Sequence, residues 1–314
     1  MERNLFVYES HYGTTKKVVD IFALLAANSK VCDVKEFNAN FELYDNIFFA
    51  VGFHGQDTAK LISELIIKHK DILFDKKIGY IGVGLSEHGS ENYIKIIENA
   101  LGRNVDYDMF VHGEVRVDKL TLEDKETLKV FLEKQNLKLI DMGVFKEEEV
   151  CDKASLIIDK IKRNGKTMPD EMLKKEIDDF INSKNTCVLS TGDDDFVRGT
   201  PIEFLYHKDN FYFITEGGLK YRGILKNRNV SICLFNEYSG FNKLKGLQIE
   251  GKAEFVEIGS PEYKEIMKLK NIKEEFLKNV PINMNVLKVK IKRYEFLNSE
   301  FREKGFDSKQ IYVL

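Results

Sequence analysis

The chain has 314 residues, of which 43% are hydrophobic and 32% are charged, and its formal net charge at pH 7 is −3. This composition excludes disorder, collagen and a coiled coil as descriptions of the whole chain, and the nearly neutral charge argues against a nucleic-acid-binding surface. The length predicts about two domains of roughly 150 residues each.

Neither a membrane span nor a signal peptide is expected. No apolar run approaches the ~20 residues that cross a bilayer, and the N-terminus leads directly into a strand-like segment. The spacing of the four cysteines fits neither a zinc site nor a redox pair, so we interpret Cys32, Cys151, Cys187 and Cys233 as buried thiols. We therefore expect a cytoplasmic protein without a metal site.

In the first half of the chain, short apolar runs alternate with longer segments of helical periodicity. The pattern predicts strands over 5–8, 46–51, 78–84 and 110–117, and helices over 15–27, 58–70, 91–101, 122–134 and 146–163. This β-α-β-α alternation is typical of an α/β doubly wound parallel sheet with helices on both faces.

The pattern changes at 164–169, where Gly165 is a typical helix stop and Pro169 a typical first-turn residue. We expect domains over 1–165 and 166–314, with net charges of −5 and +2. After one helix over 170–183, strand-like runs follow one another at 186–191, 197–206, 210–215, 230–235, 244–257 and 286–296. Consecutive strands with tight turns predict an antiparallel β-barrel.

The first predicted strand is followed by hydroxyl side chains around a glycine: Ser10, Gly13, Thr14 and Thr15. A turn that leads into a helix presents N–H groups and the positive end of a dipole to an anion, and hydroxyls add neutral donors. The turn has neither the lysine of a Walker loop nor the glycine spacing of a dinucleotide fingerprint. Helix capping alone explains one hydroxyl, not three. We therefore predict a phosphate loop over residues 10–15.

This loop resembles the flavodoxin phosphate loop, Ser/Thr-x-x-Gly-x-Thr, at Ser10, Gly13 and Thr15. The resemblance covers about residues 3–163 and implies an FMN whose phosphate lies at the loop. The segments 112–115 and 120–125 are similar to the flavodoxin subgroup that includes the bacterial flavodoxin-like protoporphyrinogen oxidase.

In doubly wound sheets, ligands bind at the carboxyl ends of the strands. Strand 46–51 ends in Gly52-Phe53-His54-Gly55-Gln56, and the next strand ends at Gly84. In a flavodoxin these two loops bracket the flavin ring, and glycine lets backbone approach it closely. The resemblance thus implies ring contacts from Gly52, Phe53, His54 and Gly84, with Phe53 or His54 stacked on the ring. For His54 and His88, a loop position without a role stays open as the alternative.

In the second half, Arg198, Lys220 and Arg222 fall on neighbouring predicted elements and are expected to converge on one anion. A guanidinium binds phosphate in a bidentate manner and an ammonium supplies a point charge. Thr215 is a further donor, and Pro201 predicts an edge strand or a bulge. The alternative is a barrel with ordinary surface cations.

The ordered pattern Arg-x-x-Pro, Thr-x-Gly-Gly-x-Lys, Asn-x-x-Val-Ser resembles the FMN-binding split barrel of the pyridoxamine 5′-phosphate oxidase-like superfamily, over about residues 168–314. The resemblance implies FMN contacts from these residues: Arg198, Thr200, Pro201, Thr215, Lys220 and Arg222. It also implies a homodimer with FMN at the subunit interface, for which Phe241, Lys243, Gln248 and the tail 301–312 are candidates. The oxidase's substrate-phosphate arginines are not recognisable, so its vitamin reaction is not implied.

Two such domains imply an FMN-dependent oxidoreductase with one or two FMN per chain. It passes electrons from a donor, such as NAD(P)H or a reduced carrier, to a small-molecule or protein acceptor. No catalytic side chain is assigned. One alternative is a haem- or cofactor-binding split barrel with a non-catalytic docking domain, its axial ligand being among His54, His88, His112 and His207. Another is that only the barrel holds FMN.

Overall fold

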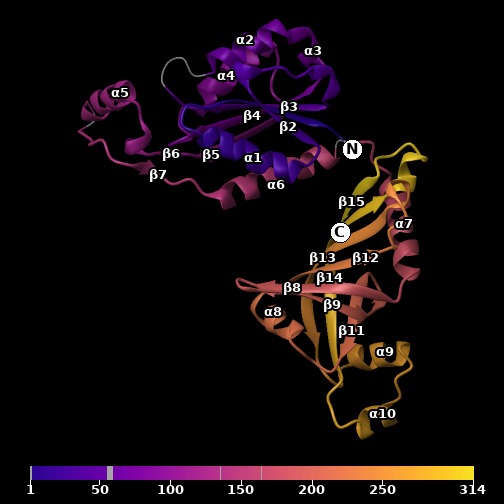
Figure 1. Cartoon of the computed structure of the whole chain (residues 1–314). Helices are drawn as coiled ribbons and strands as arrows, with labels where there is room; N and C mark the ends of the chain where they lie inside the picture. The colour runs from indigo at the N-terminus through magenta and orange to yellow at the C-terminus, as the bar shows by residue number, and fades with distance from the viewer. Residues whose placement is uncertain (1, 55–58, 135, 164) are drawn as a thin grey trace. The chain divides into compact units, whose positions relative to one another are not determined.

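The computed structural model describes residues 2–54, 59–134, 136–163 and 165–314. The chain folds into two compact units, Met1–Ile161 and Lys162–Leu314, each with its own sheet (Figure 1). Among the described residues, no helix combines the length and the apolar character that crossing a membrane requires.

The first unit is built on a five-stranded parallel sheet in the order β2-β1-β3-β4-β5. Its strands are β1 (Asn4–Glu9), β2 (Ser29–Asp33), β3 (Asn46–Gly52), β4 (Lys77–Gly84) and β5 (Tyr107–His112). The central strands β1, β3 and β4 are nearly continuous buried runs because both of their faces are covered. The predicted doubly wound sheet is confirmed, and β2 adds an edge strand that was not predicted.

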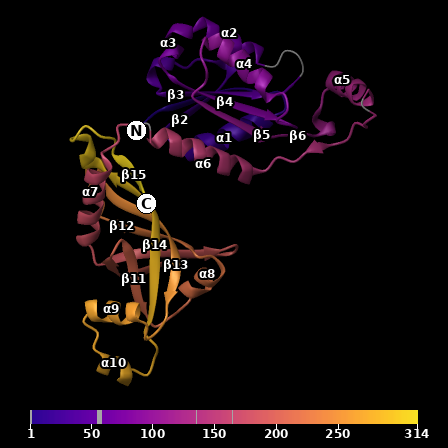
Figure 2. The ribbon, with the colours of Figure 1, turned by 180° about the vertical axis from the view of Figure 1, so that it is seen from behind.

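Helices cover both faces of this sheet (Figures 1 and 2). On one face pack α1 (Thr14–Ala26) and α6 (Glu147–Arg163). On the other pack α2 (Lys60–Lys68), α3 (Lys70–Phe74) and α4 (Ser90–Leu101). Two short 3-10 helices, η1 (Val34–Glu36) and η2 (Phe41–Leu43), link β2 to β3. The predicted helix over 58–70 is interrupted at His69, which lies between the end of α2 at Lys68 and the start of α3 at Lys70.

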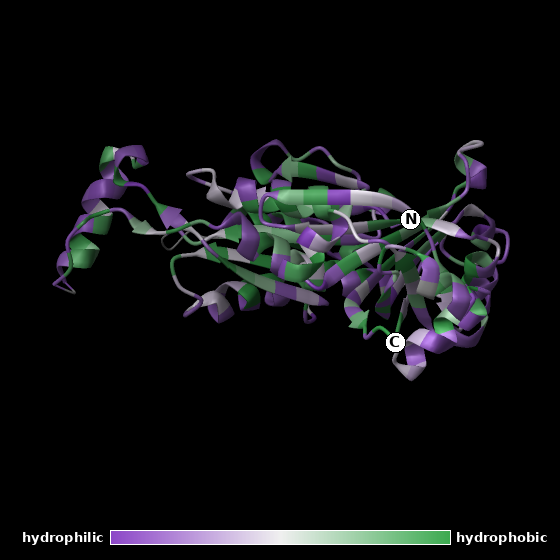
Figure 3. Cartoon of the chain, turned by 90° about the horizontal axis from the view of Figure 1, so that it is seen from below, coloured by the Kyte–Doolittle hydropathy of each residue, from purple (hydrophilic) through white to green (hydrophobic). Residues whose placement is uncertain are grey.

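Residues 113–146, which we call the insertion, leave the sheet between β5 and α6 (Figures 1 and 3). The insertion contains the paired strands β6 (Glu114–Val115) and β7 (Met142–Gly143), the 3-10 helix η3 (Val117–Lys119) and the helix α5 (Leu122–Glu133). The predicted strand over 110–117 is therefore wrong as one element. Its first part pairs with β4 up to His112, and its second part pairs with β7 instead.

The second unit is an antiparallel sheet of eight strands in the order β10-β11-β14-β13-β12-β8-β9, with β15 on β14. The strands are β8 (Thr186–Asp193), β9 (Phe196–Glu203), β10 (Leu205–His207), β11 (Asn210–Thr215), β12 (Asn229–Phe235), β13 (Lys245–Val256), β14 (Asn285–Asn298) and β15 (Lys309–Val313). Side chains alternate between core and surface along β13, as expected where one face is buried. The sheet curls into a half-barrel, which confirms the predicted split-barrel class.

Four helices accompany this sheet: α7 (Asp170–Asn182), α8 (Lys220–Lys226), α9 (Pro261–Leu269) and α10 (Glu274–Asn279). Two 3-10 helices, η4 (Phe241–Lys243) and η5 (Ser299–Arg302), complete the described elements. The predicted run over 197–206 is divided between β9 and β10 at Phe204, which is buried in the core. Strand β9 ends the hydrogen-bonded path, so the prediction that Pro201 lies at an edge is confirmed.

Candidate functional site

The phosphate loop and the ends of β3 and β4 meet at one cavity of about 460 Å³ in the first unit. All residues predicted for this site except Gly13 line the cavity: Ser10, Thr14, Thr15, Gly52, Phe53, His54 and Gly84. Gly55 and Gln56 of the predicted ring-binding loop lie outside the described residues. A cavity of this size suits a small-molecule ligand.

The phosphate loop leaves the start of α1 without a side-chain cap. Gly13 is the N-cap residue at a φ of 88°, a left-handed conformation that favours glycine. Its N–H donates to Ser10 Oγ at 3.1 Å, and no side chain accepts a capping hydrogen bond from the first turn. The donors of this turn and the neighbouring hydroxyls therefore form a neutral anion-binding surface.

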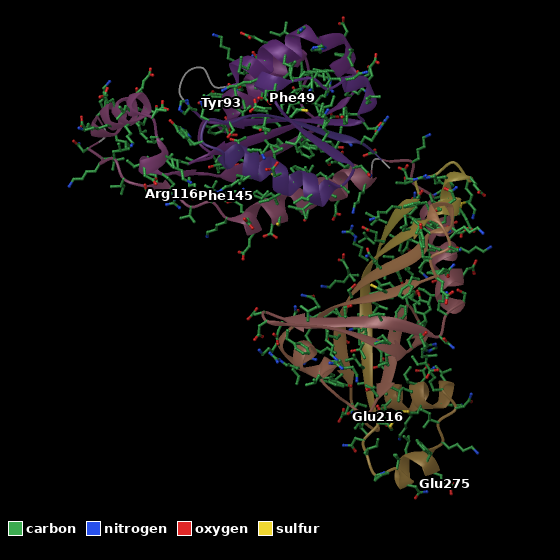
Figure 4. The ribbon with its side chains drawn as sticks, in the orientation of Figure 1. Phe49, Tyr93, Arg116, Phe145, Glu216 and Glu275 are labelled. Atoms are coloured by element: carbon green, nitrogen blue, oxygen red, sulfur yellow. The ribbon has the colours of Figure 1, made fainter. Side chains whose placement is uncertain are left out.

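Two glycines of the cavity wall make room for neighbouring side chains. A Cβ on Gly84 would overlap the ring of Phe53, and a Cβ on Gly52 would lie 2.5 Å from Thr15 Oγ1. The Phe53 ring also packs on Tyr93 of α4, with ring centroids 4.4 Å apart. Figure 4 labels Tyr93 on the first unit. Protein atoms fill the space that a Cβ would take at each glycine, so glycine is required here by the packing of Phe53 and Thr15; that their backbone approaches a ligand ring stays a prediction.

His54 connects the phosphate loop to the insertion. Its ring stacks on His11, with centroids 3.9 Å apart and planes 13° apart. Its Nε2 lies 3.4 Å from Asp124 Oδ1 on α5, and Tyr12 donates its hydroxyl proton to the other oxygen of Asp124. The hydrogen bond from Tyr12 lowers the pKa of Asp124, so this carboxyl is ionised at neutral pH.

Sequence reasoning missed the contribution of the insertion and of the loop's own aromatic side chains. The residues concerned are His11, Tyr12, Leu120, Asp124, Leu128 and Phe131, all of which line the cavity. The Thr121-x-x-Asp124 pattern, in which Thr121 Oγ1 accepts from the Asp124 N–H at 3.1 Å, marks the start of α5. It says nothing about where the helix lies, so no local signal reveals this wall.

In the second unit, Lys220 is buried without an acidic partner. Lys220 is the first residue of α8 and is 7% exposed, and its ammonium group donates to the carbonyl of Gly217. Among the described residues no carboxylate forms an ion pair with it. Burial lowers the pKa of Lys220, nearby Arg198 lowers it further, and Glu216 (Figure 4) opposes both effects. A buried cation without a counter-ion is costly, so this position fits an anionic ligand.

Three buried hydroxyl groups of the second unit have no hydrogen-bond partner among the residues that the structure describes: those of Thr191, Thr200 and Tyr221. Thr191 pairs with Arg198 across β8 and β9, and Thr200 lies two residues further along β9, on the same face as Arg198. The Tyr221 ring centroid is 5.5 Å from Lys220 Nζ. Buried polar atoms are normally satisfied, so this group also fits a polar ligand.

Two residues predicted for this site, Arg222 and Pro201, do not join Lys220. Arg222 forms an ion pair with Asp195 at 3.0 Å and packs over the Phe196 ring. Residues two apart on a helix do not face each other, which separates its side chain from that of Lys220. Pro201 lies on the face of β9 opposite to Arg198 and Thr200. The predicted Thr215, in contrast, does lie beside Lys220: its hydroxyl donates at 3.3 Å to the Gly217 carbonyl, which also accepts from the Lys220 ammonium group.

The candidates for a pocket shared between subunits fall into two groups. Phe241 is 80% exposed, and Gln248 is exposed on β13. Phe301 is fully buried in the core of its own barrel, and the tail ends in β15, which pairs with β14. Phe301 is thus part of the chain's own core, whereas Phe241, Gln248 and the residues of β15 that are not buried stay candidates for a shared pocket.

Three of the four histidines considered as haem ligands face carboxylates. His54 lies beside Asp124, His112 Nδ1 is 2.9 Å from Glu149, and His207 Nε2 is 3.1 Å from Glu265. His88 lies in the exposed loop before α4. These contacts give each of the first three a role in local structure.

Comparison with known proteins identifies both halves of the chain. Residues 5–137 match a family model described as a flavodoxin domain, and residues 173–298 match one described as pyridoxamine 5′-phosphate oxidase. Domains of both kinds bind flavins in general. No curated protein matches the chain significantly.

Among solved structures, the chain is similar to HutZ, the heme storage protein of Vibrio cholerae, with 15% identity, coverage of 45% of this chain and 94% of HutZ, and a TM-score of 0.34. Campylobacter jejuni ChuZ shows 16% identity, coverage of 55% of this chain and 73% of ChuZ, and a TM-score of 0.36. General Stress Protein 26 of Bacillus anthracis shows 22% identity, coverage of 45% of this chain and 98% of that protein, and a TM-score of 0.32. Likenesses at this level carry no functional argument.

Proposed function

We propose that this chain, which joins a flavodoxin-like domain to a pyridoxamine 5′-phosphate oxidase-like split barrel, is an FMN-dependent oxidoreductase. One FMN binds in the cavity of the first unit and a second binds at Lys220. The chain passes electrons from a reduced donor, such as NAD(P)H or a reduced carrier, to a small-molecule or protein acceptor. The observation that carries this proposal is the convergence of the phosphate loop and the ends of β3 and β4 on one cavity.

The residues around the cavity fit FMN. Ser10, Thr14 and the uncapped first turn of α1 offer hydrogen-bond donors to a phosphate, and the helix dipole favours its negative charge. The rest of the wall is mainly apolar and suits a flat ring system; it is formed by Phe53, Val83, Leu85, Val115, Leu120, Leu128 and Phe131. His54 and Asp124 close the cavity between β3 and α5.

The residues around Lys220 fit the phosphate of a second FMN. The buried ammonium group supplies the charge, and Arg198 on the neighbouring edge strand adds a guanidinium. The unpartnered hydroxyls of Thr191, Thr200 and Tyr221 supply further donors. Of the residues predicted here, Arg198, Thr200 and Lys220 belong to this set, Thr215 shares the Gly217 carbonyl with Lys220, and Pro201 and Arg222 are left out of the proposal.

When bound, FMN supplies the electron chemistry, and the chain supplies binding, orientation and exclusion of water. In the first unit, α5 shields one side of the cavity with Leu128 and Phe131. Both sites in one chain raise the effective concentration of one flavin near the other. We assign no catalytic side chain to either unit.

We also propose that the chain forms a homodimer through its barrel and works in the cytoplasm without nucleic-acid or membrane partners. Split barrels of this type are commonly dimers. Exposed apolar side chains such as Val197, at 88%, and Phe241, at 80%, lie on the sheet and its loops. The cysteines are free, which suits a reducing compartment.

FMN titration of the full chain, followed by flavin fluorescence, tests this function. Replacing Ser10 and Thr15 together by alanine removes two phosphate-loop hydroxyls and is expected to weaken one FMN site about 100-fold, at roughly 1.5 kcal/mol for each bond to a charged group. Lys220→Ala is expected to weaken the other site. The controls are Ser63→Ala on α2, whose hydroxyl bonds to the Lys60 carbonyl, and Lys226→Ala, which faces Asp193.

Haem binding by the barrel in place of FMN would contradict this proposal and support the alternative function. It would appear as a wild-type chain that binds no FMN but develops a Soret band with haem, and that loses the band when one of the histidines named above is replaced. FMN binding that is unaffected by all of the site variants would also contradict the assignment.

A further inference from the structure

The anion-binding end of the cavity has no permanent cation. Among the described residues that line the cavity there is no lysine or arginine, and the phosphate loop offers only neutral donors. The lining side chains that can gain a positive charge are His11 and His54, and its carboxylates are Glu114 and Asp124. A dianionic ligand at this loop therefore meets imidazoles where many phosphate sites have a lysine or an arginine.

His11 is the imidazole that belongs to the phosphate loop itself, between Ser10 and Tyr12. Much of the His11 side chain is exposed, but its partial desolvation lowers its pKa, and His54, stacked at 3.9 Å, and Lys35 lower it further; Asp124 acts in the opposite direction. These groups, with the Tyr12 hydroxyl on Asp124, are the titratable neighbours that η1, the β3 end and α5 place around the stack. His11 is therefore neutral near pH 7 in the ligand-free cavity.

We propose that His11 is a proton-binding phosphate ligand: its ring takes up one proton from solvent when a phosphate monoester binds at residues 10–15. This inference rests on the proposed function, which places the FMN phosphate there. A dianion close to an imidazole favours the charged imidazolium form. The negative charge of Asp124, which lies 3.4 Å from His54 and raises the pKa of His11, helps the stack to accommodate that proton.

The sign of the pH dependence follows from this arrangement. The pKa of His11 lies below its ordinary value in the free protein and rises in the complex, so binding takes up a proton between these two values. Affinity for a phosphate dianion therefore increases as the pH falls through this window. A phosphate monoester itself gains a proton near pH 6, which works against binding, so the comparison requires a variant that lacks only the imidazole.

Isothermal titration calorimetry at pH 7, in two buffers with different ionisation enthalpies, measures the proton uptake. The full chain carries Lys220→Ala so that binding reports the first unit. FMN is compared with riboflavin, which lacks the phosphate. We expect uptake with FMN but not with riboflavin, and loss of uptake in His11→Asn and His11→Gln. His88→Asn, which changes a histidine that does not line the cavity, keeps it.

Relative to His11→Asn, the chain with His11 is expected to gain about threefold to fourfold in FMN affinity between pH 8 and pH 6.5, because one pKa unit of coupling approaches tenfold only well below both pKa values. His54→Asn removes one influence that lowers the pKa of His11 and is expected to reduce the uptake, since His11 is then partly protonated before binding. FMN binding with uptake unchanged in both His11 variants, or equal uptake with riboflavin, overturns the inference and leaves the proposed function standing.

Inorganic phosphate separates the two proposals further. NMR titration of the flavin-free chain follows the His11 ring protons with and without phosphate. If the chain does not bind FMN but phosphate raises the pKa of His11, the inference stands and the proposed function fails. If phosphate binds and leaves the His11 titration unchanged, the inference is wrong. If neither FMN nor phosphate binds, both are wrong.

Discussion

Single atoms at the carboxyl ends of β3 and β4 decide which side chains the cavity wall accepts. Position 84 has no Cβ because the Phe53 ring occupies that space, and Phe53 in turn rests on Tyr93. The wall is thus an extension of the unit's core into the site. Changes there affect both stability and ligand binding.

We expect Gly84→Ala to lower the free energy of unfolding of the first unit by about 1–3 kcal/mol, because the added methyl group pushes the Phe53 ring out of its packed position. Urea denaturation measures the change. Gly246→Ala is the control, since a Cβ there would lie 3.7 Å from the nearest atom, the Leu234 carbonyl oxygen, and its effect should stay within about 0.5 kcal/mol. Equal effects of the two substitutions would show that Phe53 relaxes without cost.

The sequence indicates some residues of the site and hides others. Ser10, Thr14 and Thr15 are recognisable because a phosphate loop is a continuous pattern directly after a strand. The stack of His11 on His54 joins segments more than forty residues apart, and the contact between His54 and Asp124 joins segments seventy residues apart. Such contacts depend on tertiary placement, which spacing in one sequence does not encode.

At the scale of elements, α5 is held to the rest of the first unit by few contacts. Tyr12 and His54 reach Asp124, and the Tyr12 hydroxyl oxygen accepts from the Thr121 N–H at 3.2 Å. Several of its apolar side chains are exposed, including Leu122 at 80%, and the insertion alternates apolar and polar residues (Figure 3). The position of this cavity wall therefore depends largely on Asp124.

We predict that Asp124→Ala speeds hydrogen exchange of the α5 amides about tenfold, because bonds to a charged group contribute roughly 1.5 kcal/mol or more. Exchange followed by mass spectrometry measures this, and Asp118→Ala, an exposed acidic residue of the same insertion, is the control. The pKa of Asp124 is lowered in the folded chain. The stabilisation of α5 by the ionised Asp124 carboxylate is therefore present above about pH 4 and is lost as the pH falls below it. Unchanged exchange in Asp124→Ala would mean that apolar contacts position α5.

The elements that sequence reasoning missed share a physical cause. Strand β2 (Ser29–Asp33) is short and largely polar because it lies at the sheet edge, where one side is solvated. Strand β15 pairs with β14, and its sequence has no alternation of apolar and polar residues that would predict a strand. The α9–α10 segment between β13 and β14 interrupts a meander that the pattern otherwise predicts as continuous sheet.

At the scale of the whole molecule, the order of predicted strands and helices was enough to predict the fold class. Alternating strands and helices in one half and consecutive strands in the other predicted two sheet types, and both are present. Each unit has its own hydrophobic core. The order of strands and helices does not predict which residues complete each site, because tertiary packing places the insertion and the buried Lys220.

The FMN content of the purified and reconstituted chain, measured as released-flavin absorbance per chain, tests the central claim most directly. We predict a value near two, with Ser10→Ala/Thr15→Ala losing one FMN and Arg198→Ala/Lys220→Ala losing the other. One FMN, lost only in the barrel variant, would contradict the assignment of the first cavity. A chain that retains no FMN would contradict the oxidoreductase proposal as a whole.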